Sequence, residues 1–134
     1  MAIDKLKTKF FTGAWLTDVK HYFVKINEML DYQTPITLSN DNDILKEIKK
    51  SYNAQVTLND NLTLKLLNLT PGDYGTIVLI QDAVGSRTIT LPSNSIVMGS
   101  GGSSSITLST NANYKDIATF YYDGTSIYWT ISLY

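Results

Sequence analysis

Hydrophobic and polar residues alternate with a period of two along most of the chain, from about residue 54 to its end. Short alternating runs that are rich in β-branched and aromatic residues, and bounded by Asn, Asp, Gly, Pro or Ser, are typical of β-strands. About eight such strands predict a mainly β fold, either an antiparallel β-sandwich or a jelly-roll-like domain. The predicted strands cover residues 55–58, 62–69, 76–81, 87–91, 95–98, 105–109, 117–122 and 125–133.

The last two predicted strands form a hairpin, because Asp123-Gly124 between two β-rich runs favours a two-residue turn. Such a turn pairs Tyr122 with Thr125, and alternate residues then point to opposite faces. One face is predicted to join the core and carries Ala118, Phe120, Tyr122, Ile127, Trp129, Ile131 and Leu133. The other is predicted to be exposed and carries Ile117, Thr119, Tyr121, Ser126, Tyr128, Thr130 and Ser132.

The hydrophobic period changes between residues 14 and 32, where it fits a helix. Apolar residues recur there at a spacing of four and three, and a second stripe runs beside the first. The pattern predicts an amphipathic helix with a wide apolar face, which ends before Pro35. This face either packs on the protein's own domain or associates with other chains, and two heptads are too few to establish a coiled coil. The face comprises Trp15, Leu16, Val19, Tyr22, Phe23, Ile26, Met29 and Leu30.

A second, short helix is predicted over residues 40–52, with Asp41 or Asn42 as its cap and Ile44, Leu45 and Ile48 on its apolar side. The acidic cluster at its start lacks the glycine and the distal glutamate of an EF-hand loop, so a helix cap explains it better than a calcium site. The predicted organisation is therefore an arm and helical anchoring segment over residues 1–53, followed by a β-sandwich domain over residues 54–134.

Composition narrows the classes of function. The 134 residues include 11 basic and 12 acidic side chains, a balance that argues against a nucleic-acid binder with a basic stripe. There is no cysteine, and His21 has no second histidine to complete a metal site. No run approaches the roughly 18 apolar residues of a membrane-spanning helix. We therefore expect no metal, no cofactor, no nucleic acid and no membrane insertion.

Catalytic signatures are missing as well. No nucleophile-elbow motif is present, and the acidic residues of the β region fall mostly at turns, where Asp bonds the local backbone. We therefore expect no enzyme activity. Tyr121 and Tyr128, with Tyr114 nearby in sequence, are candidates for contact with a glycan or a receptor, because an exposed aromatic ring can stack on a sugar or anchor an interface. The alternative is that these tyrosines are simply good strand formers.

Three segments carry a resemblance to a known family. Residues 69–78, which include Pro71-Gly72-Asp73, residues 81–92, and residues 117–129 with their Asp-Gly turn resemble small β-sandwich domains in virion proteins of tailed bacteriophages. Such proteins include head fibres, collar or tail fibres, and capsid-decorating proteins. The resemblance covers roughly residues 54–134 and rests on turn and strand signals.

The resemblance implies a structural virion protein, a fibre or capsid-decoration subunit that is held to the particle by its N-terminal region. It also implies a homotrimer, with other virion proteins of the capsid, collar or tail as partners. The apolar helix between Trp15 and Leu30 is then the segment expected to anchor or trimerise. The alternative function is a carbohydrate- or receptor-binding module that recognises a host surface glycan. We expect the protein to be made in the host cytoplasm without a signal peptide, since the N-terminus shows none.

Overall fold

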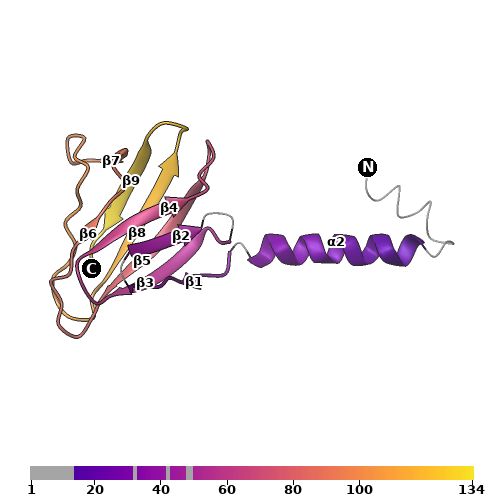
Figure 1. Cartoon of the computed structure of the whole chain (residues 1–134), viewed down its shortest axis with the longest axis horizontal. Helices are drawn as coiled ribbons and strands as arrows, with labels where there is room; N and C mark the ends of the chain where they lie inside the picture. Colours follow the sequence, from indigo (N-terminus) through magenta and orange to yellow (C-terminus); the bar gives the residue numbers. More distant parts are fainter. Residues whose placement is uncertain (1–13, 32, 42, 48–49) are drawn as a thin grey trace.

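The computed structural model describes residues 14–31, 33–41, 43–47 and 50–134. Figure 1 shows a helix that extends away from a β-domain. The helix is α2 (Ala14–Asp31). The strands are β1 (Ile36–Thr37), β2 (Asp43–Glu47), β3 (Asn53–Leu58), β4 (Leu62–Leu67), β5 (Tyr74–Gln81), β6 (Ile89–Thr90), β7 (Ser95–Val97), β8 (Lys115–Tyr122) and β9 (Ile127–Ser132). The mainly β fold and the first predicted helix are confirmed.

The first six strands alternate between two sheets. β1, β3 and β5 pair in parallel in one sheet, so that Ile36, Ala54 and Ile77 lie in register. β2, β4 and β6 pair in parallel in the other sheet, where Ile44 lies beside Leu64. The chain therefore winds through three successive turns of a two-sided coil, and the apolar side chains of both sheets meet inside it. β1 and β2 precede the expected domain boundary at residue 54, and they pair with β3 and β4, respectively.

The C-terminal strands complete the larger sheet, whose order is β1-β3-β5-β8-β9-β7. β8 is antiparallel to both β5 and β9, whereas β7 is parallel to β9. The prediction of an antiparallel sheet is therefore wrong for five of the seven strand pairs. The period-two pattern shows which residues of a strand face the core. It does not show whether neighbouring strands run antiparallel, as in a hairpin, or parallel, as in successive turns of a coil.

The prediction of a second helix over residues 40–52 is wrong, because residues 43–47 form β2. Ile44 and Lys46 are fully buried, whereas Asp43 and Glu47 are partly exposed, as a strand with one buried face requires. Lys46 reaches the interior because its Nζ donates a hydrogen bond to the Ser51 carbonyl oxygen. Burial lowers the pKa of Lys46. The expected cap at Asn42 and the apolar position Ile48 lie outside the described residues.

The β8–β9 hairpin has the predicted faces but not the predicted register. Tyr122 pairs with Ile127 rather than with Thr125, so the connection is longer by two residues. Asp123 explains the longer loop, because its Oδ1 accepts hydrogen bonds from the backbone N–H of Thr125 (2.8 Å) and Ser126 (2.7 Å). A shift of two residues preserves the faces. Phe120 and Trp129 accordingly lie in the core, although Leu133 is exposed.

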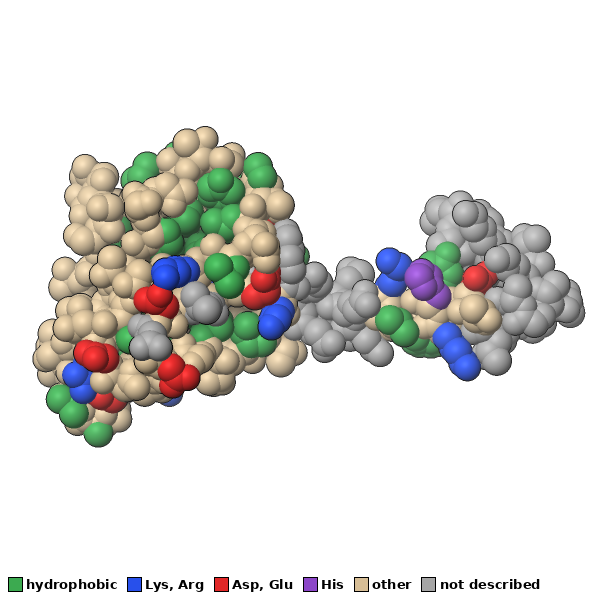
Figure 2. All heavy atoms as spheres, viewed as in Figure 1, with side chains coloured by type: hydrophobic (Ala, Val, Ile, Leu, Met, Phe, Trp, Pro, Cys, Tyr) green, Lys and Arg blue, Asp and Glu red, His purple; other side chains and the backbone are tan. Residues whose placement is uncertain are grey.

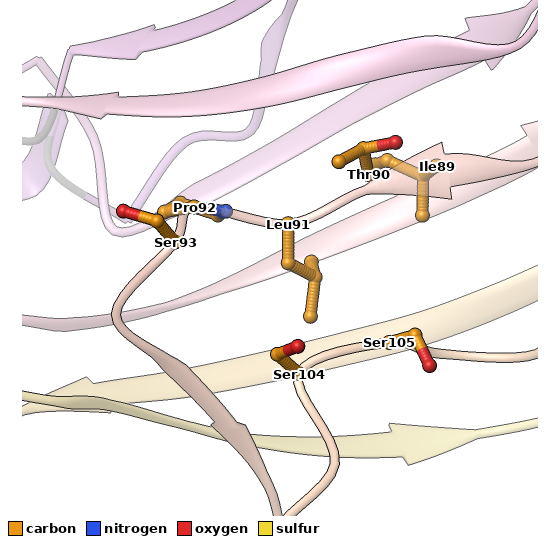
Figure 3. Close-up of a pocket in the computed structure, with 7 residues that line it drawn as sticks. All are labelled: Ile89, Thr90, Leu91, Pro92, Ser93, Ser104 and Ser105. Carbon is orange, nitrogen blue, oxygen red and sulfur yellow. The ribbon is translucent and has the colours of Figure 1, made fainter.

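The predicted strand over residues 105–109 does not form. Leu108 is buried in the same core as the strands, so this segment covers part of the core without pairing. A groove of about 370 Å³ separates its start from the edge strand β6 (Figure 3). The glycine-rich segment before it supplies positive φ angles at Gly99, Gly101 and Gly102. The groove is lined by Ile89, Thr90, Leu91, Pro92, Ser93, Ser104 and Ser105.

A loop between β5 and β6 is held by its own side chains. The Asp82 carboxylate accepts hydrogen bonds from Arg87 Nη2 (2.8 Å) and Nε (3.1 Å), and from the N–H groups of Val84 and Gly85. The Gln81 side chain exchanges two hydrogen bonds with the Arg87 backbone. Arg87 and the loop N–H groups lower the pKa of Asp82 to about 2.

The lowered pKa of Asp82 predicts that this residue contributes to the loss of folding stability in acid. The folded-state pKa lies below the value of about 3.9 expected in an unfolded chain, so the contribution is present above pH 4 and is lost as the pH falls toward 2. Asp82→Asn is therefore expected to reduce stability at pH 7 and to flatten its decline between pH 4 and pH 2. Urea unfolding at both ends of this range measures the difference. An equally steep decline in the variant would contradict the assignment.

Candidate binding face of the six-stranded sheet

Three tyrosines line up across the outward face of the larger sheet. The strand register places Tyr74 of β5 beside Tyr121 of β8, and Tyr121 beside Tyr128 of β9. These residues alternate along their strands with buried positions, so their side chains point away from the core. Tyr74 and Tyr121 are 54% and 50% exposed. The alignment gives one end of the sheet an aromatic surface.

Tyr52 extends this row at one end. Its ring stacks on the ring of Tyr74, with centroids 4.9 Å apart and planes inclined by 10°. The backbone makes this possible, because the N–H of Thr76 donates to the Tyr52 carbonyl oxygen (2.8 Å). A side chain at Gly75 would collide with that oxygen, since a Cβ there would lie 2.5 Å from it. We call Tyr52, Tyr74, Tyr121 and Tyr128 the tyrosine row.

Tyr128 is held in place by the hairpin loop. Its hydroxyl donates to Asp123 Oδ2 (3.0 Å), while the other carboxylate oxygen caps the loop. The loop N–H groups of Ser126 and Thr125 lower the pKa of Asp123, and the Asp123 carboxylate raises the pKa of Tyr128. The carboxylate is therefore charged at neutral pH and fixes the Tyr128 ring before any ligand arrives.

A polar row runs beside the tyrosine row on the same face. Asn53, Thr76, Thr119 and Thr130 follow one another in register across β3, β5, β8 and β9. Three of them lie two residues along their strand from a member of the tyrosine row, so the two rows are neighbours. The face thus combines aromatic rings, which can stack on a ligand, with amide and hydroxyl groups, which can fix the orientation of the ligand.

The structure brings together two of the three tyrosines proposed from the sequence. Tyr121 and Tyr128 are adjacent, whereas Tyr114 precedes the opposite end of β8 and packs against Tyr134, with ring centroids 4.2 Å apart. Sequence reasoning missed Tyr52 and Tyr74. The strand alternation around Tyr74 signals an outward position, but only the pairing of β5 with β8 places it beside Tyr121.

Helix α2 carries the other set of predicted contact residues. Val19, Tyr22, Phe23 and Ile26 lie three or four residues apart, on one face of the helix. Phe23 is 63% and Ile26 51% exposed. Figure 2 shows hydrophobic side chains at the surface of the helix, between lysine and histidine side chains. The side chains of Trp15, Leu16, Met29 and Leu30 lie outside the described set.

Among the described residues, no group of His, Cys, Asp or Glu is arranged to hold a metal ion. Within the same part of the chain, no helix is long and apolar enough to cross a membrane.

Comparison with known proteins identifies the family. Residues 33–127 match the family model described as "Putative phage tail fibre C-terminal domain". The match begins just after α2 and runs through all strands from β1 to the start of β9. No curated protein and no solved structure matches the chain. Because the match to this family model covers most of the sequence, the chain belongs to the phage tail fibre C-terminal domain family.

Proposed function

We propose that this protein is a homotrimeric tail fibre subunit that is assembled and attached to the particle through helix α2. As a phage tail fibre domain, it is a structural protein of the virion. The observation that carries the proposal is the exposed apolar face of α2. The family match starts at residue 33, so α2 lies outside the matched residues.

The exposed face is better suited to other helices than to water. Val19, Tyr22 and Ile26 repeat at intervals of three and four residues, which is the spacing of a helix–helix seam. Full burial stabilises each large apolar side chain by about 1.5–3 kcal/mol. In a trimer, each of the three chains buries its own copy of these side chains. The resulting stabilisation offsets the free-energy cost of bringing the chains together. Copies of α2 are therefore the proposed occupants of this face.

A cysteine cross-link tests which face of α2 lies at the seam. The chain has no cysteine, so Val19→Cys introduces a single thiol. In a parallel bundle, side chains at a seam position approach closely enough for a disulfide. We expect Val19→Cys to form disulfide-linked dimers under mild oxidation, as measured by non-reducing electrophoresis. His21→Cys is the matched control, because His21 is exposed on the opposite face of the same helix.

Two outcomes of the cross-linking experiment would contradict the proposed seam. Equal cross-linking of the Val19→Cys and His21→Cys variants would indicate random collision, and no cross-linking at Val19 would exclude the proposed seam.

A second function is favoured by the tyrosine row. We propose that the outward face of the six-stranded sheet contacts the surface of the host cell. The support is the alignment of four tyrosines at one end of the face, with Tyr128 already fixed by Asp123. Exposed aromatic residues of this kind are common anchors of binding surfaces. This role is tested by measuring how the labelled full chain and its Tyr121→Ala variant bind to bacterial cells.

A further inference from the structure

We propose that the side chains of Ser51 and Asn53 form a lock that fixes the direction in which helix α2 leaves the β-domain. The described core contains no residue of α2, and Figure 1 shows the helix extending away from the β-domain, so its direction depends on the connection between them. A fixed direction gives every chain of an assembly the same angle between helix and sheets. The use of the lock in a fibre rests on the assembling role proposed for α2, whereas the lock itself does not.

The lock holds the two backbone carbonyl groups that follow the helix. The Ser51 hydroxyl donates to the Thr34 carbonyl oxygen (2.7 Å), and the Asn53 side-chain amide donates to the Gln33 carbonyl oxygen (2.8 Å). The Ser51 hydroxyl also accepts a hydrogen bond from the Asn53 N–H (3.0 Å), which links the two side chains. The connection after α2 is therefore tied to the β-domain by two hydrogen bonds.

Burial makes the lock costly to open. Ser51 and Lys46 are both fully buried, and Lys46 Nζ donates to the Ser51 carbonyl oxygen. A swing of the helix that withdraws Thr34 would remove the acceptor of the buried Ser51 hydroxyl, and such a loss costs more free energy than an ordinary hydrogen bond contributes. If Ser51 moved with the helix, the buried Lys46 amine would instead lose its acceptor. Both movements are therefore opposed.

The segment that carries the lock is itself fixed to the larger sheet. The Tyr52 carbonyl oxygen accepts a hydrogen bond from the Thr76 N–H (2.8 Å), and β3 runs on from Asn53 in parallel with β5. Gly75 permits this approach of the two backbones, because a Cβ there would lie 2.5 Å from the same oxygen. Residues 51–53 therefore move together with the sheet.

The connection between the helix and the sheet is too short to absorb much movement. Helix α2 ends at Asp31, and β1 begins at Ile36, which pairs with Ala54 of β3. Pro35 stands between them, and its ring fixes its own φ and keeps the preceding residue out of the helical region. A proline and two bound carbonyl groups thus leave few backbone angles free to change.

The distance between two spin labels, one on the helix and one on the sheet, tests the lock. The chain has no cysteine, so His21→Cys and Thr130→Cys introduce two exposed labelling sites. Every sample also carries Ile26→Asp, which keeps chains apart so that each distance is measured within one chain. By pulsed electron paramagnetic resonance we expect one narrow distance distribution. Ser51→Ala should broaden it roughly twofold or more, because a small swing is magnified along the about 15 Å of helix between residues 21 and 31.

Ser95→Ala is the matched control for this experiment. Ser95 is also buried, and its hydroxyl accepts a hydrogen bond from Trp129 Nε1 (3.0 Å). It lies in β7, at the opposite edge of the sheet from β1. We expect both alanine variants to unfold at lower urea concentration and only Ser51→Ala to broaden the distances. Equal broadening in Ser95→Ala would indicate a general loosening of the β-domain and would overturn the lock.

The remaining outcomes are equally decisive. A broad distribution in the reference chain would overturn the lock, as would an unchanged distribution in a folded Ser51→Ala variant. If Ser51→Ala does not fold, Asn53→Ala decides, because Asn53 is only partly buried and its loss frees the Gln33 carbonyl group. The distances are measured within single chains, whereas assembly is measured as the mass of the unmodified chain. Failure of the lock is therefore distinguishable from failure of the assembling role of α2.

Discussion

Replacing Gly85 with alanine is expected to lower the free energy of unfolding by about 3–5 kcal/mol, because two penalties add. Gly85 has a φ of +79°, which a residue with a Cβ rarely adopts. A Cβ there would also lie 2.4 Å from the Thr110 carbonyl oxygen and 2.9 Å from the Ala112 nitrogen. Both obstacles are backbone atoms, so the loop that holds Asp82 and Arg87 has to move away from residues 110–112.

Gly72→Ala separates the two penalties. Gly72 also has a positive φ, of +93°, but no atom lies within 4 Å of the position its Cβ would take. We expect this control to cost only the backbone strain, about 1–2 kcal/mol. Urea unfolding of both variants, followed by circular dichroism, measures the difference. Equal losses would show that the close approach at Gly85 is relieved at no cost.

The elements set by local periodicity could be predicted from the sequence. The period of 3.6 places α2, and alternation places the strands and separates the buried Phe120 and Trp129 from the exposed Tyr121. The hairpin faces survive an error in the turn because a shift of two residues keeps each side chain on its face. These features depend on residues that are near one another in sequence.

The features that depend on distant residues could not be predicted. Ile44 and Ile48 fit a helix as well as a strand, and a lysine between them argues for solvent rather than core. Only the pairing with β4, about 20 residues further along the chain, makes residues 43–47 a strand and turns Lys46 into the core. The tyrosine row likewise depends on the pairing of β5 with β8, which unites Tyr74 and Tyr121 from positions 47 residues apart.

Ile26→Asp is expected to abolish the association of the chains. Ile26 is 51% exposed in the single chain and sits on the apolar face of α2. In a trimer this change would place three carboxylates close together in a desolvated seam, which costs several kcal/mol for each charge. The described core contains no residue of α2, so the β-domain should stay folded. His21→Asp adds the same charge on the opposite face and should leave the assembly intact.

Sedimentation equilibrium of the full-length chain tests the central claim, that α2 assembles the fibre subunit. We predict a mass three times the 15.0 kDa of one chain for the unmodified protein and for His21→Asp, and the mass of a single chain for Ile26→Asp. Circular dichroism of Ile26→Asp should still show the β-domain. A single-chain mass for the unmodified protein at micromolar concentration, or loss of the β signal in Ile26→Asp, would contradict the account.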